Sequence, residues 1–151
     1  MLYKVLVVLV LLGHVNVCMA SQTPRWVGAV IHHSATESGD AAAFRRYHIE
    51  VKGWDDIGYH FVILRDGTIE PGRPLNKEGA HKRGRNRTHV GICLVGNDTF
   101  TKAQLVSLVE LLKQLQGEHA IVAIEPHHED CPGDGIDFEN LKSRFGPGKE
   151  L

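Results

Sequence analysis

The sequence carries no excess of charge of either sign. Its 17 Lys and Arg are balanced by 18 Asp and Glu, for a formal net charge of -1. A protein that binds nucleic acid through its phosphates normally has a basic surplus, so the composition argues against a nucleic-acid partner. The sequence also lacks internal repeats and linker-like stretches. With 151 residues, 42% of them hydrophobic, it is ordinary for one globular domain.

No apolar run in the chain is long enough to span a bilayer in isolation. The run Val5 to Leu12 follows the basic residue Lys4, and small residues precede Ser21. This pattern predicts a signal peptide over 1–20, cut after Ala20, and a mature domain over 21–151. The alternatives are an uncleaved anchor and lipidation at Cys18. We therefore expect a secreted or periplasmic protein that has no stable membrane insertion after cleavage.

Cysteine is scarce, with three in the whole chain. Removal of Cys18 leaves Cys93 and Cys131, which an exported protein could join in a disulfide. Cys93 lies in the apolar run 90–95 and is typical of a small buried hydrophobe. Cys131 closely follows two histidines, which suits a metal ligand better. A disulfide and a metal site exclude each other at Cys131.

Histidine, in contrast, is abundant. Nine of the ten histidines lie beyond residue 20, which suggests metal binding or acid–base chemistry. The predicted strand Trp26 to Ile31 leads into His32 and His33. Neighbouring side chains on a strand point to opposite faces, so only one of the two can face a given site. Taken alone, the pair is more typical of one core histidine and one exposed histidine.

Apolar periodicity and turn residues predict the other elements. They are a helix over 40–51 capped by Asp40, strands over 59–64 and 68–70 joined by the turn 65–67, a strand over 89–95, a helix that opens with the capping box 101–104 and stops at Gly117, a strand over 120–124, and a helix over 138–145. Between them, residues 71–87 form a basic loop that is either substrate-facing or simply a solvated surface.

The histidines and Cys131 together suggest a catalytic zinc site with one ion per chain. Such a site commonly has three protein ligands and leaves the fourth position to water. His32, one of His127 and His128, and Cys131 would supply two imidazoles and one thiolate. The site would stay cationic enough to lower the pKa of a bound water towards ~7.

Six segments follow one another between residues 26 and 145: Ile31–Thr36, Gly53–Phe61, Arg65–Thr68, Gly79–His81, Val90–Gly96 and His127–Pro132. In this order they resemble the zinc-dependent N-acetylmuramoyl-L-alanine amidases of the phage-lysozyme type, which share their fold with the peptidoglycan recognition proteins. The resemblance implies a single α/β domain with a central mixed sheet of roughly five or six strands flanked by helices. The site would lie in a groove at the strand ends.

The resemblance also implies residue roles for cleavage of the bond between N-acetylmuramic acid and L-alanine in peptidoglycan. The zinc ligands would be His32, His127 and Cys131. Tyr59 would be catalytic, since its phenol adds a hydrogen bond where charge develops. The residues expected to line the substrate cleft are His33, His81, Arg83 and His128. His60 is expected in the core.

One departure from the family pattern concerns the last two ligands. In the phage-type relatives these are more widely spaced, and a catalytic lysine stands two positions before the cysteine. Here that place holds Glu129, for which we predict an acid–base role, with His128 as the alternative proton carrier. The competing function is a binding module that holds peptidoglycan without cutting it, but such relatives typically lack the metal cysteine. We expect a monomer.

Overall fold

The structure, a computed structural model, describes residues 25–148 and is organised around β1, the strand Gly28–His33. The other elements, in chain order, are α1 (Ala41–Glu50), β2 (Phe61–Ile63), β3 (Ile69–Pro71), β4 (His89–Leu94), α2 (Lys102–Glu118), β5 (Ala123–Pro126) and α3 (Phe138–Phe145). Over these residues the strands form a five-stranded sheet in the order β3-β2-β4-β1-β5. This α/β architecture confirms the predicted fold class.

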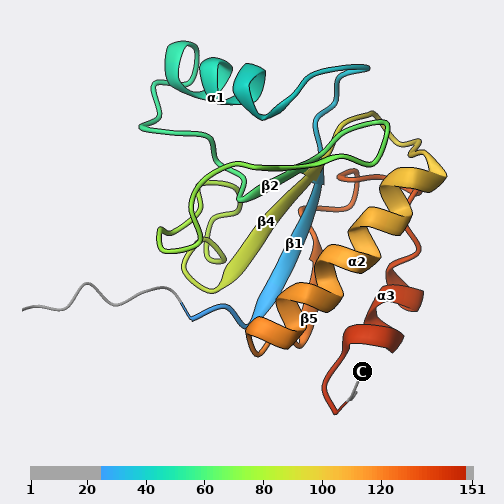
Figure 1. Ribbon diagram of the computed structural model, residues 1–151. Helices are drawn as coiled ribbons and strands as arrows, with labels where there is room; N and C mark the ends of the chain where they lie inside the picture. Colours follow the sequence, from blue (N-terminus) through green and yellow to red (C-terminus); the bar gives the residue numbers. More distant parts are fainter. Residues whose placement is uncertain (1–24, 149–151) are drawn as a thin grey trace, which may run out of the picture.

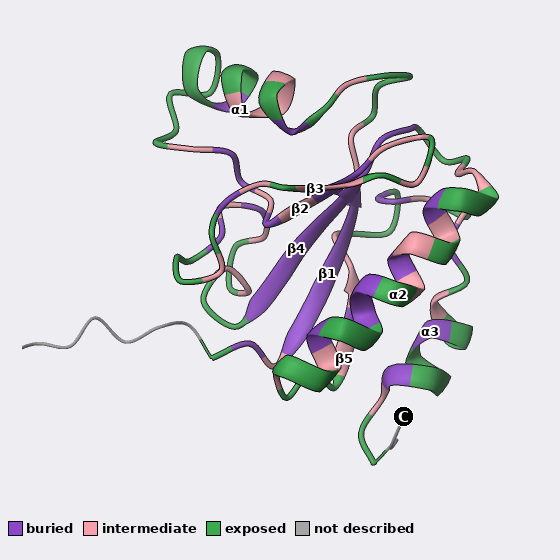
Figure 2. Ribbon diagram, in the orientation of Figure 1, coloured by how far each residue is buried: buried purple, intermediate pink, exposed green. Residues whose placement is uncertain are grey.

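The sheet is mixed, as expected. β1 pairs in parallel with both β4 and β5, and β2 pairs in parallel with β4, whereas β3 is an antiparallel edge strand. β1 and β4 are buried over almost their whole length (Figure 2). Continuous apolar runs are typical of parallel strands covered on both faces, which explains why these two segments read as unbroken hydrophobic stretches.

Helices α2 and α3 lie side by side against one face of the sheet (Figure 1). The apolar stripe of α2 packs on the inward residues of β1 and β4; its buried leucines are Leu108, Leu111, Leu112 and Leu115. The predicted capping box is present, with Thr101 and Gln104 bonding each other's backbone N–H groups. Gln104 Nε2 also donates to the carbonyls of Ile63 and Val95, which ties α2 to the ends of two strands.

The opposite face of the sheet carries a smaller core. Val62 and Val95 pack there with Ile57 and with Ala41, the first residue of α1. In the strand register His32 is paired with Cys93, and Cys93 with Val62, so alternation places the His32 side chain on this face. α1 and the loops that carry Ile57 and His81 cover this face, and the His32 side chain lies beneath them.

Several element boundaries differ from those predicted. β1 covers Gly28–His33 and not 26–31, so that both His32 and His33 belong to the strand, and further differences are found in β5, β2 and α2. β5 occupies 123–126 and not 120–124, because the N–H of Ile121 bonds back to the His119 carbonyl just after α2 and the strand pairing with β1 begins at Ala123. β2 begins at Phe61, two residues later than expected. Gly117 lies inside α2, which ends when the N–H of His119 bonds the Leu115 carbonyl.

Across residues 25–148 we find no helix that combines the length and the apolar character needed to cross a membrane. The predicted signal peptide over 1–20, with Cys18 and the cleavage point after Ala20, lies outside the described residues.

Candidate active site

Two of the predicted ligands meet because β1 and β5 are parallel neighbours. Parallel strands end at the same edge of a sheet, and here Ile31 of β1 is in register with Pro126 of β5. The N–H of His127 donates to the Ile31 carbonyl at 3.0 Å, which continues the ladder by one residue. The rings of His32 and His127 consequently lie 4.5 Å apart, centroid to centroid.

Cys131 reaches the same place through a tight turn. The N–H of His128 donates to the Cys131 carbonyl at 3.2 Å, and the N–H of Cys131 donates back to His128 at 3.1 Å. The N–H of His33 donates to Cys131 Sγ at 3.5 Å and so links the thiol to the end of β1. The short chain between His127 and Cys131 is therefore long enough to bring both residues to one site.

The three residues fit a zinc ion. One ligand atom from each of His32, His127 and Cys131 lies within 4.8 Å of the other two. Zinc bonds of about 2.0–2.3 Å place tetrahedral ligand atoms roughly 3.3–3.8 Å apart, so small side-chain rotations suffice. Two imidazoles and one thiolate are ligands that zinc prefers. His32 and Cys131 are buried and His127 is half-buried, so the cluster opens on the His127 side.

Burial shifts the pKa values of all three cluster residues towards their uncharged forms. Burial holds the pKa of His32 well below its ordinary value, and the nearby imidazoles of His81 and His127 add to this effect. Burial likewise lowers the pKa of His127. Both rings are therefore neutral at neutral pH, which is the form that binds metals. Burial raises the pKa of Cys131, and a metal ion would overcome this by displacing the thiol proton.

Tyr59 lies against the cluster. Its ring is 5.1 Å from the ring of His32 and 5.4 Å from the ring of His48. Burial raises the pKa of Tyr59, and the thiols of Cys93 and Cys131 act in the same direction. The phenol thus keeps its proton through the neutral range and can act as a hydrogen-bond donor.

His33, His128 and Glu129 are near the cluster but outside the three-ligand group. His33 and Glu129 line a cavity of about 420 Å³ together with Asp98, Asp130 and Asp134, so this side of the site is acidic. His33 Nδ1 is buried and lies 3.7 Å from Asp98 Oδ1. Both His128 and Glu129 are exposed.

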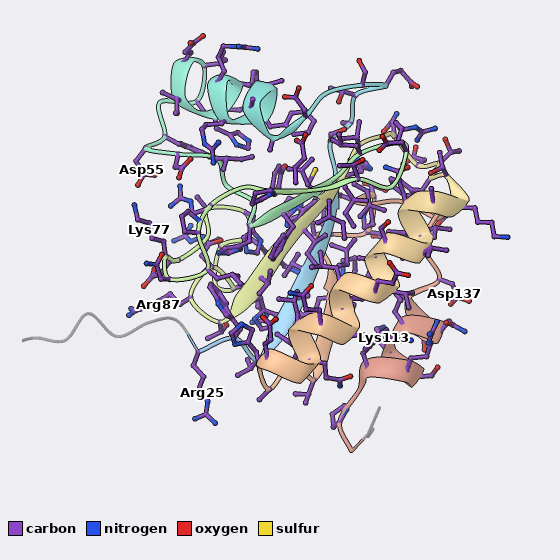
Figure 3. The ribbon with its side chains drawn as sticks, viewed as in Figure 1. Arg25, Asp55, Lys77, Arg87, Lys113 and Asp137 are labelled. Carbon is purple, nitrogen blue, oxygen red and sulfur yellow. The ribbon has the colours of Figure 1, made fainter. Side chains whose placement is uncertain are left out.

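His81 and Arg83 lie on the other side, along the basic loop. They line a larger cavity of about 640 Å³ together with Trp54, Lys82 and Arg87. Arg83 is exposed. Lys77 and Arg87 of the same loop lie near each other at one edge of the molecule (Figure 3). His81 is almost fully buried, and burial lowers its pKa to about 3. The basic loop thus borders the site, as expected.

Lys82 is one residue near the site that sequence reasoning did not single out. Its Nζ donates to the carbonyl of Pro126 at 2.8 Å, directly before His127. Arg85 Nε reinforces this link through Glu125 at 2.9 Å. The spacing of the motifs carries no signal for the contact, because it joins positions 44 residues apart.

The structure also places the two cysteines and the histidines that were expected in the core. Cys93 and Cys131 are both free thiols, so the metal-ligand use of Cys131 is open and the disulfide alternative is absent over the described residues. His60 is buried in the core, as expected, where Nδ1 accepts from the N–H of Gly91. His48 packs on Trp54, and its Nδ1 accepts from the N–H of Gly58.

Several known proteins are similar to this chain in both sequence and fold. The family model described as N-acetylmuramoyl-L-alanine amidase matches residues 22–134. An endolysin of Enterobacteria phage K11 is 39% identical over 113 residues, which cover 68% of this chain and 74% of the endolysin. Peptidoglycan-recognition protein SC2 of Drosophila melanogaster is 36% identical over 126 residues, or 72% and 68% of the two chains. The solved structure of the amidase LysC from Clostridium intestinale aligns with a TM-score of 0.73 at 33% identity, over 82% and 85% of the two chains.

Proposed function

This chain belongs to the N-acetylmuramoyl-L-alanine amidase family, and from that premise we propose that it is an exported zinc hydrolase. Its reaction is hydrolysis of the amide bond between N-acetylmuramic acid and L-alanine in peptidoglycan. The observation that carries the proposal is the convergence of His32, His127 and Cys131, with Tyr59 against them. This is a three-ligand set with an open side, as catalytic zinc sites have.

The metal ligands and Tyr59 have different roles in the proposed reaction. His32, His127 and Cys131 hold one zinc ion per chain. The ion supplies Lewis-acid polarisation of the scissile carbonyl and an acidified water. Tyr59 donates its phenol hydrogen to the carbonyl oxygen as negative charge develops there, and its burial keeps that donor protonated and desolvated.

Proton transfer to the leaving amine is assigned to Glu129. This residue stands two positions before Cys131, where the resembling enzymes have a lysine, and it lines the acidic cavity with His33. A carboxylate beside a catalytic zinc can accept a proton from water and return it to the amine that leaves. His128, which is adjacent and exposed, is the alternative carrier.

Substrate binding is assigned to the two cavities that flank the cluster. Stem peptides of peptidoglycan carry carboxylates, and Arg83 offers an exposed guanidinium in the larger cavity, which His81 also lines. On the opposite side His33 lines the acidic cavity, and His128 is assigned to substrate binding as an exposed neighbour of His127. The protein acts as a monomer in this scheme.

A binding module without catalysis is the second candidate function. The fold alone allows it, since one fold serves several functions. The complete ligand set together with Tyr59 favours the enzyme, because a module that only holds muropeptide has no use for a metal thiolate.

Export rests on the pattern of residues 1–20 alone. The residue found at the amino terminus of the mature protein decides between cleavage after Ala20, a retained anchor and lipidation at Cys18.

Incubation of the purified protein with peptidoglycan tests the proposed function. We expect free stem peptides with a new L-alanine amino terminus, identified by mass spectrometry. The products should disappear when a chelator removes the metal and return when zinc is added, because the cluster has no catalytic power of its own without the ion. Intact muropeptides in the presence of one bound zinc per chain would reject the enzyme and leave the binding module.

Glu129→Gln tests the proton carrier. The amide cannot exchange a proton, so we expect kcat to fall about 10²-fold while zinc content is unchanged. Asp130→Asn is the matched control, because Asp130 is the next residue, is also exposed and lines the same cavity. Full activity in a zinc-loaded Glu129→Gln protein would move the role to His128.

A further inference from the structure

His81 is hydrogen-bonded directly to one of the residues of the metal cluster. Its Nδ1 lies 3.1 Å from Nε2 of His32, and both side chains are buried. Its other ring nitrogen, Nε2, lies 3.1 Å from the backbone carbonyl of His89. Three groups are thus connected in one line: the His89 carbonyl, the His81 ring and the His32 ring.

The carbonyl at one end of this line determines where the hydrogens are. A carbonyl oxygen only accepts, so Nε2 of His81 must carry the hydrogen of its neutral ring. Nδ1 of His81 then has a lone pair and accepts from His32. It follows that Nε2 of His32 carries a hydrogen, and that the lone pair of the neutral His32 ring is on Nδ1.

The His81 ring is itself tightly fixed. The side-chain oxygen of Asn86 accepts from the backbone N–H of His81 at 2.8 Å. The ring lies against two glycines, where a Cβ added at Gly79 or Gly91 would come within 2.4 or 2.5 Å of its Cδ2 atom. A ring enclosed in this way cannot turn to offer Nδ1 elsewhere, so the orientation that the His89 carbonyl imposes passes on to His32.

From these contacts we propose that His81 is a positioning residue for the metal site: it fixes the tautomer and ring orientation of His32 so that Nδ1 faces the metal. The inference rests on the proposed zinc site, because it concerns how one of its ligands is held. The outer hydrogen bond of a metal-bound histidine commonly goes to a carboxylate, a backbone carbonyl or water. Here a second imidazole takes that place and relays a backbone carbonyl.

Other roles for His81 agree less well with these contacts. As a substrate contact it would need a free polar atom, yet both ring nitrogens are engaged inside the protein. As a further zinc ligand it would have to join the group formed by His32, His127 and Cys131, from which it is absent. A role as core filler alone would not require a nitrogen facing His32.

Substitutions at His81 separate its two hydrogen bonds. His81→Asn can keep an acceptor near the position of Nδ1, whereas His81→Gln can keep the donor to His89 but does not place its amide oxygen at the position of Nδ1. His81→Leu removes both. We expect the zinc affinity of the full chain, measured by competition with a chelator, to fall about 10–100-fold in the Leu and Gln variants and to recover largely in the Asn variant. Equal affinity in all four proteins would overturn the inference.

Gln104→Leu is the matched control, because Gln104 is also a buried polar side chain with two hydrogen bonds but belongs neither to the relay nor to the three-ligand group. This variant should lose thermal stability, as His81→Leu does, and keep its zinc affinity within about threefold. A parallel loss of zinc in Gln104→Leu would mean that removal of any buried polar group affects the metal through general destabilisation, which contradicts a specific role for His81.

The tautomer can also be observed directly. In protein with ¹⁵N-labelled histidine and ¹¹³Cd in place of zinc, we expect a scalar coupling between the metal and Nδ1 of His32, with a hydrogen on Nε2. Coupling to Nε2 of His32 would overturn the inference while leaving the metal site and the proposed function intact. Absence of stoichiometric metal from the wild-type protein would instead refute the proposed zinc enzyme.

Discussion

Cys131→Ser is expected to abolish both zinc binding and amidase activity. The hydroxyl of serine does not ionise near neutral pH, so the cluster loses its only anionic ligand and retains two neutral imidazoles. We expect zinc affinity to drop by at least about 10³-fold and activity on peptidoglycan to fall to background. Zinc content by elemental analysis and product release by mass spectrometry provide the two measurements.

The fold itself should survive this substitution. Cys131 lies in the turn after β5, outside both hydrophobic cores, and serine has nearly the same size. Cys93→Ala is the informative control, since Cys93 is a buried thiol on β4, in register with His32, but does not belong to the three-ligand group. That variant should cost about 1 kcal/mol of stability and keep its zinc. Undiminished zinc affinity in Cys131→Ser would refute the assigned ligand set.

Most of the fold could be predicted from local patterns. The helix α3 was predicted with its observed bounds, and the capping box of α2 placed that helix to within one residue of its start. The position of β5 could not be obtained in this way. Both 120–124 and 123–126 contain apolar residues, and what selects the second is parallel pairing with β1, where Gly28 faces Ala123. Such pairing depends on residues that are distant in sequence.

The same distinction between local patterns and long-range contacts applies to the candidate site. Adjacent histidines at a strand end and a nearby cysteine are visible in the sequence, and the structure brings His32, His127 and Cys131 together. The contacts that support these residues could not be predicted from the spacing of motifs in the sequence. His81 meets His32 across 49 positions, and Lys82 meets Pro126 across 44. Both contacts come from a loop whose composition predicts only a basic surface.

The short connection between His127 and Cys131 shows which features of a site can be predicted from residue spacing and which require the structure. The sequence alone shows that the chain between His127 and Cys131 is long enough for a turn, but not which turn it forms. The structure answers through two backbone hydrogen bonds between His128 and Cys131, which close the turn, and a third from His33 to the thiol. The compact loop therefore preserves the ligand set, with Glu129 two positions before Cys131.

Tyr59→Phe is expected to separate chemistry from metal binding. Phenylalanine keeps the aromatic ring between His32 and His48 and removes only the hydroxyl. If that hydroxyl donates to the developing oxyanion, kcat should fall about 10²–10³-fold, because one preorganised donor in a desolvated site contributes on this scale. The Michaelis constant should change little, since the bond strengthens only as charge develops.

Zinc affinity of Tyr59→Phe decides between this role and the competing ones. Tyr47→Phe is the matched control, because Tyr47 lies on α1 with 48% of its surface exposed and is expected to leave kcat unchanged. A low kcat with zinc retained identifies Tyr59 as a group that acts on the substrate. Loss of zinc would make it a support for His32, and full activity would leave the oxyanion without any contribution from this phenol. The hydroxyl of Tyr59 thus tests how the site stabilises the charge that develops on the scissile carbonyl.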